Sequence, residues 1–518
     1  MDDFRKRLLD HYGLTEEEFA RLAREPSFSS IPRLDGALSA QVAKTRILQS
    51  VEAKEKVLIY GDYDTDGIMA TAIMVRCFHY LKKSVSFFIP SRYSDGYGLT
   101  MENAKKIAKA GYGLVILVDN GVSCFQEVSY LLSQGVETII IDHHDIASSV
   151  LPPALSTIHP TLVPYGDYPV SAGYLCFLFS CVLLGYKDDY LLTLGALSTI
   201  SDCMPIHGHN REIVALALRA IRKNEYPEIM MLTDRRLIDE SVLSMTVVPV
   251  INAVGRIVED HSLSRVVHYF SELDPKDKPS LAKWMREVNQ ARKDMTATAL
   301  ERLRPEPDKP AIVVIGYLKV GLNGLLANRL LGTYDKPVAV FSKSPSASDQ
   351  YTGSLRAKEG CNVMEFIRSI PHLIVQSGGH DYAAGLSIKQ SDYPAFKEAF
   401  ETFAFRHPFV KRQEKLFEIG LSDVTMENYR LLRLLGPFGH DYPEPTFLLR
   451  DLRVSALQFG RNGNLKSPLG LDVELFSFSF KKPDVVTFED TVSLKGAMRL
   501  EDYQGKVTLK LRCEEVKE

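Results

Sequence analysis

Acidic and histidine side chains occur in four short motifs of the chain, GDYDTDG (61–67), VDNG (118–121), IDHHD (141–145) and ISDCMP (200–205). Four or more carboxylates held together repel one another strongly unless divalent cations neutralise them. Histidine beside carboxylates favours Mn²⁺, with Mg²⁺ also suited, over the all-oxygen ligand set of Ca²⁺. Two such ions about 3.5–4 Å apart activate a water molecule and stabilise the leaving oxygen of a phosphoryl displacement. The motifs therefore predict metal-assisted hydrolysis of a phosphate ester.

The elements that must position these motifs are predicted to be strands of a parallel sheet. Short apolar runs alternate with helical segments, a pattern typical of strands covered on both faces; the runs are VLIY (57–60), LVILVD (114–119) and VETIIID (136–142). Ligands gather at the carboxyl ends of such strands, so the four motifs are expected to converge on one edge of the sheet. Asp-Gly and Asn-Gly pairs also occur in ordinary turns. A turn needs neither paired histidines nor three alternating aspartates, which favours the metal site.

Length and composition indicate a globular protein of several domains. The chain has 518 residues, 45% hydrophobic and 25% charged, and this length corresponds to about three or four domains. The net charge of −3 excludes a wholly basic nucleic-acid coat but permits a local basic groove. Seven cysteines without a C-x-x-C pair favour a reducing compartment over a disulfide framework or a zinc ribbon.

Targeting signals are not expected in this sequence. The first residues, MDDFRKRLLDHYGL, contain no apolar core of the kind that a secretory signal needs. Residues 168–186 carry no charge, but their strongly apolar part is only about 12 residues long, so a buried helix is predicted rather than a membrane span. The expected location is the cytoplasm, with no membrane partner.

Changes in pattern along the chain predict an α/β protein with five segments. They are an N-terminal helical segment (1–50), a first α/β domain with a doubly wound parallel sheet (51–210), a long helical connector (211–303), a second α/β domain (304–408) and a C-terminal all-β barrel of the OB type (409–518). The three prolines of RPEPDKP (304–310) mark one boundary. Short strands and the turn GRNGN (460–464) indicate the barrel. A chain ending near Lys411 is expected to keep its active site and to bind long strands more weakly.

These motifs resemble those of a known superfamily. DYDTDG, VDNG, DHH and SD, in this order, resemble the four motifs of the DHH phosphoesterases, and GSLR (353–356) and SGGHDYAAG (377–385) resemble the DHHA1 domain that follows them. Three further segments narrow the resemblance to the RecJ family, namely PSRYSDGYGLT (90–100), PVINAVGR (249–256) and GPFGHDYPEP (436–445). The family consists of bacterial single-stranded-DNA-specific 5′→3′ exonucleases with a terminal domain of the OB type. The resemblance thus implies a metal-dependent exodeoxyribonuclease of DNA repair and recombination that releases mononucleotides.

The resemblance also implies roles for individual residues. The expected metal ligands are Asp64, Asp66, Asp119, His143 and Asp202. Asp119 is expected to bridge two Mn²⁺ or Mg²⁺ ions, and His144, the sixth member of the expected catalytic set, to contact the scissile phosphate. Asp62 and Asp142 are expected to orient ligands or to bind metal themselves. The expected nucleic-acid contacts are Arg92, Tyr97, Arg256, Ser354, Arg356 and His380.

Some positions depart from the family pattern, and none of them is an expected metal ligand. Ala357 stands where a serine is usual, Leu318 and Lys319 replace a Trp-His pair, and Asn323 replaces an aliphatic residue. The substrate contacts near these positions are therefore in doubt. The family further implies single-stranded DNA as substrate, a monomer, and single-strand-binding protein and a RecQ-type helicase as partners.

Three alternative functions share parts of this pattern. A smaller DHH phosphodiesterase would act on nanoRNA or cyclic nucleotides, but such enzymes end after the DHHA1 region, whereas this chain continues with a β-rich segment. A non-catalytic replication scaffold related to RecJ would have lost metal ligands, and here all four motifs are intact. A class II pyrophosphatase places a histidine where this chain has Tyr60. The exonuclease is therefore preferred, with the small-nucleotide phosphodiesterase as the alternative.

Overall fold

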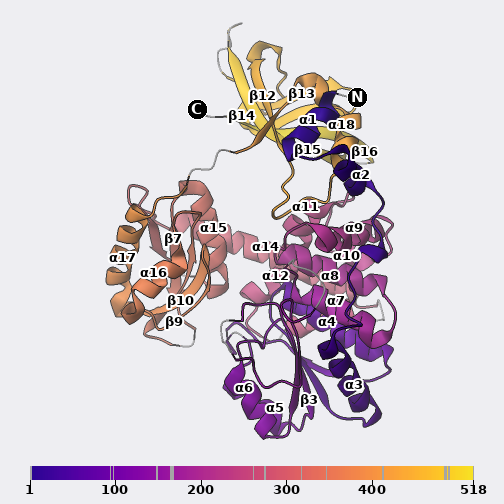
Figure 1. Ribbon diagram of the computed structural model, residues 1–518. Helices are drawn as coiled ribbons and strands as arrows, with labels where there is room; N and C mark the ends of the chain where they lie inside the picture. The colour runs from indigo at the N-terminus through magenta and orange to yellow at the C-terminus, as the bar shows by residue number, and fades with distance from the viewer. Residues whose placement is uncertain are drawn as a thin grey trace.

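The computed structural model describes residues 3–516 except for gaps at 94, 97, 147–149, 164–168, 261, 273–275, 317, 346, 411–413, 484–486, 488–489 and 504. Figure 1 shows the first α/β domain and the connector as one body, with the second α/β domain beside it and the C-terminal domain above the connector. The long helix α14 (Lys278–Arg302) runs from the connector to the second α/β domain. The predicted order of an α/β domain, a helical connector, a further α/β domain and a strand-rich domain is confirmed.

The first α/β domain is built on five parallel strands in the order β2-β1-β3-β4-β5, namely β1 (Val57–Tyr60), β2 (Ser86–Phe88), β3 (Leu114–Val118), β4 (Glu137–Ile141) and β5 (Ser156–Ile158). Alternate side chains of β1 enter different cores. Val57 and Ile59 pack with helices α4 (Thr65–Tyr80) and α7 (Ala172–Leu184), whereas Leu58 and Tyr60 pack with α5 (Met101–Lys109) and α6 (Phe125–Ser133). Burial of both faces explains why the strands are apolar throughout, and it confirms the predicted parallel sheet.

Further helices cover one face of this sheet. They are α3 (Leu38–Glu52), α8 (Asp189–Ser201) and α9 (Gly208–Arg222), which pack around α4 and α7. Helix α7 contains most of the charge-free segment, and eleven of its thirteen residues are buried. The prediction of a buried helix at this position is confirmed.

The connector is helical, as predicted. Its helices are α10 (Pro227–Met230), α11 (Glu240–Val242), α12 (Val248–Ile257), α13 (Leu263–Ser271) and α14, and a π-helical stretch, η2 (Leu243–Val247), joins α11 to α12. Within the described residues, the run Glu240–Ile257 is the one helix long and apolar enough to cross a membrane. Half of this run is buried inside the protein, which fits an internal helix that connects domains.

The second α/β domain has a mixed sheet in the order β6-β7-β8-β10-β9. Its strands are β6 (Ile312–Ile315), β7 (Val338–Lys343), β8 (Gln350–Arg356), β9 (Gln376–His380) and β10 (Ala383–Lys389), and only β6 and β7 pair in parallel. The helical segments are η3 (Val320–Leu322), α15 (Asn323–Tyr334), α16 (Val363–Ser369), η4 (Pro371–Leu373), η5 (Gln390–Asp392) and α17 (Tyr393–Arg406).

The C-terminal domain contains a six-stranded sheet in the order β11-β12-β15-β16-β14-β13. The strands are β11 (Leu416–Glu418), β12 (Thr446–Arg453), β13 (Asn464–Gly470), β14 (Val473–Lys481), β15 (Thr491–Tyr503) and β16 (Lys506–Glu515). Helix α18 (Met426–Leu434) and the short η6 (Leu421–Asp423) and η7 (Val454–Ala456) complete it. The register shift between Leu449 and Leu452 in β12 marks a bulge, a device that bends strands in small barrels.

The N-terminal helices lie with the other end of the chain. Helices α1 (Asp3–Tyr12) and α2 (Glu16–Ala23) place Phe4, Leu8 and Phe19 in the core of the C-terminal domain (Figure 1). A capping box begins α2, because Thr15 and Glu18 exchange side-chain-to-backbone hydrogen bonds.

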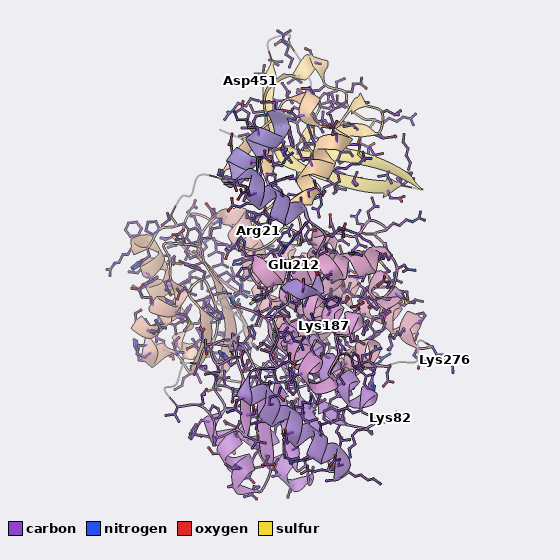
Figure 2. All side chains as sticks on the ribbon, turned by 45° about the vertical axis from the view of Figure 1, so that its right-hand side comes forward. Arg21, Lys82, Lys187, Glu212, Lys276 and Asp451 are labelled. Atoms are coloured by element: carbon purple, nitrogen blue, oxygen red, sulfur yellow. The ribbon has the colours of Figure 1, made fainter. Side chains whose placement is uncertain are left out.

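From α2 the chain passes through η1 (Phe28–Ser30) along the first α/β domain. Glu212 of α9, labelled in Figure 2, accepts a hydrogen bond from the Ser27 amide and lies 3.5 Å from Arg24. This N-terminal segment (residues 24–30) therefore links the C-terminal domain to the first α/β domain.

Candidate metal centre and arginine cluster

The loop between β1 and α4 holds three aspartates in a tight turn. Asp64 caps α4, since its Oδ1 accepts hydrogen bonds from the amides of Asp66 (3.0 Å) and Gly67 (3.2 Å). A Cβ at Gly67 would lie 2.6 Å from the Asp62 nitrogen, so only glycine lets the loop close in this way. The alternation Asp-x-Asp-x-Asp is thus built into a helix start at the carboxyl end of β1.

Asp66 is held from the opposite side by α7 and α8. Its carboxylate accepts hydrogen bonds from the amides of Ala172 (2.9 Å) and Gly173 (2.7 Å) at the start of α7. The hydroxyl of Ser198 in α8 donates a third. The first turn of a helix carries unpaired amides, which stabilise a buried carboxylate in its charged form.

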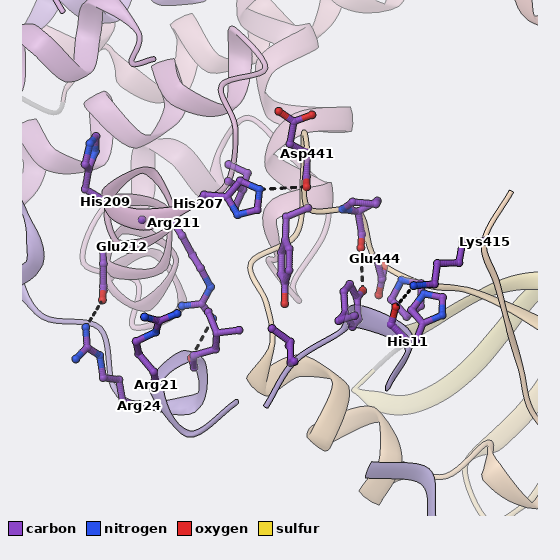
Figure 3. Close-up of a pocket in the computed structure, with 18 of the residues that line it drawn as sticks. His11, Arg21, Arg24, His207, His209, Arg211, Glu212, Lys415, Asp441 and Glu444 are labelled. Atoms are coloured by element: carbon purple, nitrogen blue, oxygen red, sulfur yellow. Dashed lines mark hydrogen bonds and ion pairs between the residues drawn. The ribbon is translucent and has the colours of Figure 1, made fainter. Parts of the chain in front are cut away.

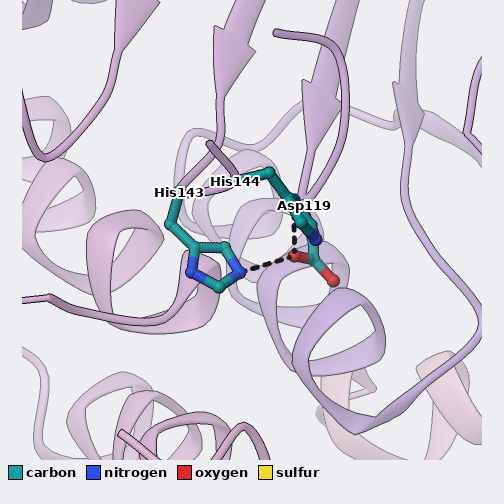
Figure 4. A group of neighbouring side chains, drawn as sticks. All are labelled: Asp119, His143 and His144. Atoms are coloured by element: carbon teal, nitrogen blue, oxygen red, sulfur yellow. Dashed lines mark ion pairs between the residues drawn. The ribbon is translucent and has the colours of Figure 1, made fainter. Parts of the chain in front are cut away.

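Asp119 lies at the end of β3 in a strained backbone conformation. Its φ is +60°, a region that non-glycine residues seldom adopt outside special sites. In the described part of the chain its buried Oδ1 has no hydrogen-bond partner, and it lies 3.3 Å from Nε2 of His143 (Figure 4). The same His143 nitrogen is 3.5 Å from Asp66 and 3.6 Å from Asp202. Motifs from three strand ends and from the end of α8 therefore meet around one imidazole.

The second histidine is oriented by Asp142. Nδ1 of His144 is 2.7 Å from Asp142 Oδ1, and the other Asp142 oxygen accepts a hydrogen bond from the Val122 amide. Burial alone would raise the pKa of Asp142, but the hydrogen bond and the charge of His144 lower it to about 2. In return Asp142 raises the pKa of His144 to about 9 against the effect of burial. Both oxygens of Asp142 are thus hydrogen-bonded to protein groups. The raised pKa of His144 favours the charged imidazolium form at neutral pH.

The remaining carboxylates are difficult to ionise together. Burial, followed by the charge of neighbouring aspartates, raises the pKa values of Asp62 and Asp202 to about 8 and those of Asp64 and Asp119 above their ordinary range. Ligand atoms lie within 4.8 Å of one another in three groups: Asp62, Asp64 and Asp119; Asp66, His143 and Asp202; and Asp119, His143 and His144. Oxygen and imidazole donors of this kind fit Mn²⁺ or Mg²⁺, whose charge would stabilise the ionised carboxylates.

These pKa shifts predict that the protein without divalent cations loses stability as the pH rises. The folded protein holds protons on Asp62 and Asp202 up to about pH 8, whereas the unfolded chain releases them near 3.8. The contribution of these groups to the free energy of unfolding is therefore fully present below pH 3.8 and is lost as the pH rises through about 8. Thermal unfolding with EDTA or with Mn²⁺ should show a larger gain in Tm from Mn²⁺ at about pH 8.5 than at about pH 5.

The matched control for this measurement is Asp202→Asn, which removes one of the titrating groups and should reduce the pH dependence in EDTA. An equal gain in Tm from Mn²⁺ at both pH values would contradict the assignment of these carboxylates as metal ligands.

Three arginines from different parts of the chain gather beside the aspartate loop. Arg92 stacks over the ring of Tyr63 at 4.3 Å, within the Asp62–Asp64 segment, and its buried Nε has no hydrogen-bond partner among the described residues. Arg256 of α12 approaches the Gly321 carbonyl at 3.5 Å. Burial and then the charge of Arg92 lower the pKa of Arg256 to about 10, and the same two causes lower the pKa of Arg356.

The charges of this arginine cluster (Arg92, Arg256 and Arg356) act on the aspartate loop, since the charge of Asp64 favours the charged form of Arg256 and the charge of Arg92 favours the ionised form of Asp64. Within the described part of the chain, none of its members forms an ion pair with a carboxylate within 4.0 Å. Arg356 instead donates to the Ser354 hydroxyl (2.9 Å) and the Leu355 carbonyl (2.7 Å). A Cβ at Gly324, at the start of α15, would lie 2.9 Å from its guanidinium. Half-buried arginines that form no ion pair with an acid among the described residues make a site for an anion such as phosphate.

The other two predicted contacts differ in how they are placed. Tyr97 lies outside the described residues. His380 lies on the exposed edge strand β9, where it shares a row of the sheet with Ala383 and Arg356. In-register neighbours project to the same face, so the His380 side chain stands on the Arg356 face about 10 Å from it, two strand spacings away. A Cβ at Gly378, two residues before His380 in β9, would meet nothing within 4 Å, so the sheet surface beside His380 is open at this position.

Three family models match the chain in succession. Residues 56–195 match the DHH family, N-terminal domain, residues 318–404 match the DHHA1 domain, and residues 417–515 match the RecJ OB domain. In this order, the three matched domains resemble those of the RecJ family. The resemblance predicted from the strand-end motifs is thereby confirmed.

Curated RecJ proteins resemble most of the chain. The single-stranded-DNA-specific exonuclease RecJ of Bacillus subtilis is 31% identical over 79% of this chain and 54% of its own length, and that of Thermus thermophilus is 30% identical over 80% and 62%. The chain thus spans between half and two thirds of the length of these relatives. The crystal structure of Thermus thermophilus RecJ in complex with Mn²⁺ superposes with a TM-score of 0.77 at 25% identity, covering 93% of this chain and 72% of that chain.

The departures from the RecJ pattern have structural explanations. Lys319 forms an ion pair with Glu259 (2.7 Å) and donates to the Ile257 carbonyl, so it links the second α/β domain to the connector. Buried Asn323 hydrogen-bonds the Thr352 carbonyl and the Ser342 hydroxyl at the start of α15. Ala357 is 7% exposed and belongs to the core of the second domain. These residues therefore serve the packing around the arginine cluster.

Two supporting residues escaped the sequence-based prediction. Ser198 contacts Asp66, and Asn252 accepts hydrogen bonds from the amide and the hydroxyl of Thr65 at 2.9 and 3.0 Å. Asn252 lies within PVINAVGR, a segment that had indicated the RecJ family, so a signal for it existed. Ser198 lies in an apolar helix without any local signal, because its role depends on tertiary packing alone.

Proposed function

We propose that the protein is a metal-dependent exonuclease that removes nucleotides from the 5′ end of single-stranded DNA, as an enzyme of DNA repair and recombination in the cytoplasm. The observation that carries the proposal is the neighbourhood of two sites of opposite character: a cluster of aspartates and histidines at the strand ends, and a half-buried arginine cluster that forms no ion pair with an acid among the described residues. The first suits divalent cations and the second suits a phosphate. The names of the curated relatives support the same activity.

Two Mn²⁺ or Mg²⁺ ions are the proposed cofactors. Asp66, His143 and Asp202 would hold one, and Asp64 and Asp119 the other, with Asp119 between the two groups. Asp62 and Asp142 act through neighbouring groups in this proposal. When bound, the ions would supply a nucleophilic hydroxide at neutral pH and neutralise charge on the leaving oxygen. The relative of known structure was crystallised with Mn²⁺, which supports this choice.

The protein's own groups would bind and orient the scissile phosphate. His144 keeps its proton because Asp142 raises its pKa to about 9, so its ring would donate a hydrogen bond to a phosphate oxygen. Arg92, Arg256 and Arg356, with the Ser354 hydroxyl, would bind phosphates upstream of it. Tyr97 and His380 remain proposed contacts to the strand. These groups would bind and orient the DNA strand, and the metal ions would promote the hydrolysis itself.

The test is digestion of end-labelled DNA. Single strands and duplexes carrying the label at either end are incubated with Mn²⁺, Mg²⁺ or EDTA, and product length is read over time. We expect mononucleotides released from the 5′ end of single strands, little attack on duplex, and no activity in EDTA. Cleavage of dinucleotides but not of long strands would favour the small-nucleotide phosphodiesterase instead. No hydrolysis with either metal would favour the non-catalytic scaffold.

Partners other than DNA rest on the family alone. We propose a monomer that cooperates with single-strand-binding protein and a RecQ-type helicase, which would supply single strands from duplex DNA. Co-sedimentation with each purified protein at physiological salt tests this proposal, and absence of binding to both would contradict it.

A further inference from the structure

A short segment of the C-terminal domain contacts the catalytic part of the molecule directly. This docking segment (residues 436–442, GPFGHDY) lies between α18 and β12 and belongs to one of the motifs that indicated the RecJ family. Its end, at Asp441 and Tyr442, lines a cavity of about 1010 Å³ together with the N-terminal helices and the start of α9 (Figure 3). Single-strand binding by the C-terminal domain does not by itself require these contacts.

The first contact is with the loop that follows Asp202. In this Asp202 loop (residues 202–207), the Ile206 amide donates to the His440 carbonyl at 3.0 Å, and the His207 ring lies 3.2 Å from the Asp441 carbonyl. Figure 3 shows His207 reaching across to Asp441. The side chain of Ile206 is 3% exposed, and a Cβ on Gly439 would lie 2.6 Å from its Cγ1. The loop and the docking segment are therefore in close contact without room for an added methyl group.

Among the described residues, Asp202 lacks the backbone amide donors that hold three of the other carboxylates. Asp64, Asp66 and Asp142 are each held by backbone amides that donate to their oxygens. Among the described residues, no such donor reaches the carboxylate of Asp202, whose side chain is 34% exposed compared with 3% for Asp66. Asp202 ends α8, where its amide donates to the Ser198 carbonyl, and the loop that leads on from it is hydrogen-bonded to the C-terminal domain at Ile206. The position of Asp202 near His143 therefore depends on the end of α8 and on the path of this loop.

The second contact is with the connector helix that supports the aspartate loop. Buried Glu240, at the start of α11, accepts a hydrogen bond from the Phe438 amide (2.9 Å) and pairs with Arg433 (2.6 Å). The same helical run continues to Asn252, which holds Thr65 between Asp64 and Asp66. The docking segment thus contacts both the Asp202 loop and the helical run that contains Glu240 and Asn252, and each of these elements leads to the metal centre.

We propose that the docking segment is a positioning element of the metal centre, and that the C-terminal domain contributes to metal affinity and turnover in addition to any grip on DNA. The inference rests on the proposed metal-dependent function. In it, Gly439 and Ile206 are positioning residues that act through Asp202, and neither contacts the substrate. The close fit at Gly439 explains why a residue without a side chain stands at this position.

The test is Gly439→Ala in the full-length protein. The added methyl group should displace Ile206 and with it Asp202, and changes in groups that orient metal ligands weaken metal binding by about 10-fold or more. We expect this loss in Mn²⁺ titrations by calorimetry and an equal rise in the Mn²⁺ concentration needed for half-maximal turnover. The KM for a long single strand at saturating Mn²⁺ should not change. A purely DNA-binding role would produce the reverse pattern.

Two further variants make the test specific. Gly470→Ala, in β13 of the same domain with nothing within 4 Å of the added methyl group, is the matched control and should behave as the wild type. Ile206→Ala combined with Gly439→Ala removes the contacted atom and should recover much of the Mn²⁺ affinity. Far-UV circular dichroism and thermal unfolding establish that each variant is folded.

The outcomes separate this inference from the proposed function. Absence of Mn²⁺ binding by the wild type would contradict the proposed function itself. Wild-type binding with unchanged affinity in a folded Gly439→Ala variant would overturn the positioning role. If Gly439→Ala does not fold, Ile206→Val, which removes one buried methyl group from the same contact, is titrated instead. Its Mn²⁺ affinity should fall in the same direction, and unchanged affinity would overturn the inference.

Discussion

Replacing Asp119 by alanine is expected to lower the turnover of single-stranded DNA by about a thousandfold or more, the effect of losing several kcal/mol of metal-dependent stabilisation of the transition state. Asp119 shares a group of ligand atoms with Asp64, and its Oδ1 lies 3.3 Å from Nε2 of His143, so its loss would affect both proposed ions. Its buried Oδ1 has no hydrogen-bond partner among the residues that the structure describes, and its φ of +60° is a conformation that the chain maintains at an energetic cost. Initial rates at saturating Mn²⁺ measure the loss.

The controls for Asp119→Ala separate chemistry from folding. Asp335 also has a positive φ, of +51°, but lies at the end of α15, where it pairs with Lys358 on the surface. Asp335→Ala therefore imposes the same backbone demand on alanine and should leave turnover unchanged. Asp119→Asn keeps the side-chain volume, and asparagine tolerates this conformation. Retention of more than a tenth of wild-type turnover at saturating Mn²⁺ in either Asp119 variant would contradict a bridging ligand.

The fold and the metal centre follow from local sequence rules to a large extent. Runs such as VLIY and LVILV are buried on both faces, and parallel strands expose their carboxyl ends at one edge, so the convergence of Asp64, Asp119 and His143 could be predicted without knowing any contact. The groups that hold these ligands could not be predicted in this way. Ser198 and Asn252 come from helices distant in the chain, and no periodicity reports which helix packs beside which loop.

The relation between the ends of the chain is the clearest example of this limit. The amphipathic pattern of α1 predicts a helix with one buried face but not the surface that buries it. In the structure that surface is the C-terminal domain, where Phe4 packs against Phe417 with ring centroids 5.5 Å apart. A chain ending near Lys411 would therefore expose Phe4, Leu8 and Phe19 and remove the docking segment. We expect such a truncation to affect stability and the metal centre as well as DNA binding.

The docking segment shows why recognising a motif does not reveal its role. Its contacts with the Asp202 loop are made mainly by carbonyl oxygens, at His440 and Asp441, which any residue could supply. Side chains contribute at a few positions, namely Gly439 by the lack of one, Tyr442, whose ring centroid lies 5.6 Å from that of His207, and the buried partner Glu240. Such long-range backbone contacts leave little trace in a single sequence.

Arg92→Ala is expected to reduce kcat/KM for 5′-phosphorylated strands by about 10- to 100-fold, because a hydrogen bond to a charged group contributes about 1.5–3 kcal/mol. Hydrolysis at a metal centre does not distinguish the two strand directions, so a separate group must recognise the end. A terminal phosphate carries more charge than a diester and attracts a guanidinium more strongly. Arg92, with a buried Nε that lacks a partner and no acidic neighbour in ion-pair contact among the described residues, is placed to supply this charge.

The comparison that decides its role uses two substrates that differ only at the 5′ end. For 5′-hydroxyl strands the loss in Arg92→Ala should be less than about threefold, since the charge that the guanidinium would bind is absent. Arg356→Ala should show the same preference if both arginines bind one terminal phosphate. Arg92 belongs to the first α/β domain and Arg356 to the second, so the two would bind the phosphate from different domains. Arg406→Ala, at the exposed end of α17 in the second α/β domain, serves as the control for loss of a surface charge. An equal loss on both substrates would mean that Arg92 binds the DNA backbone without regard to the end. Recognition of the 5′ end would then have to come from Ser354 or from protein groups on the other side of the DNA strand.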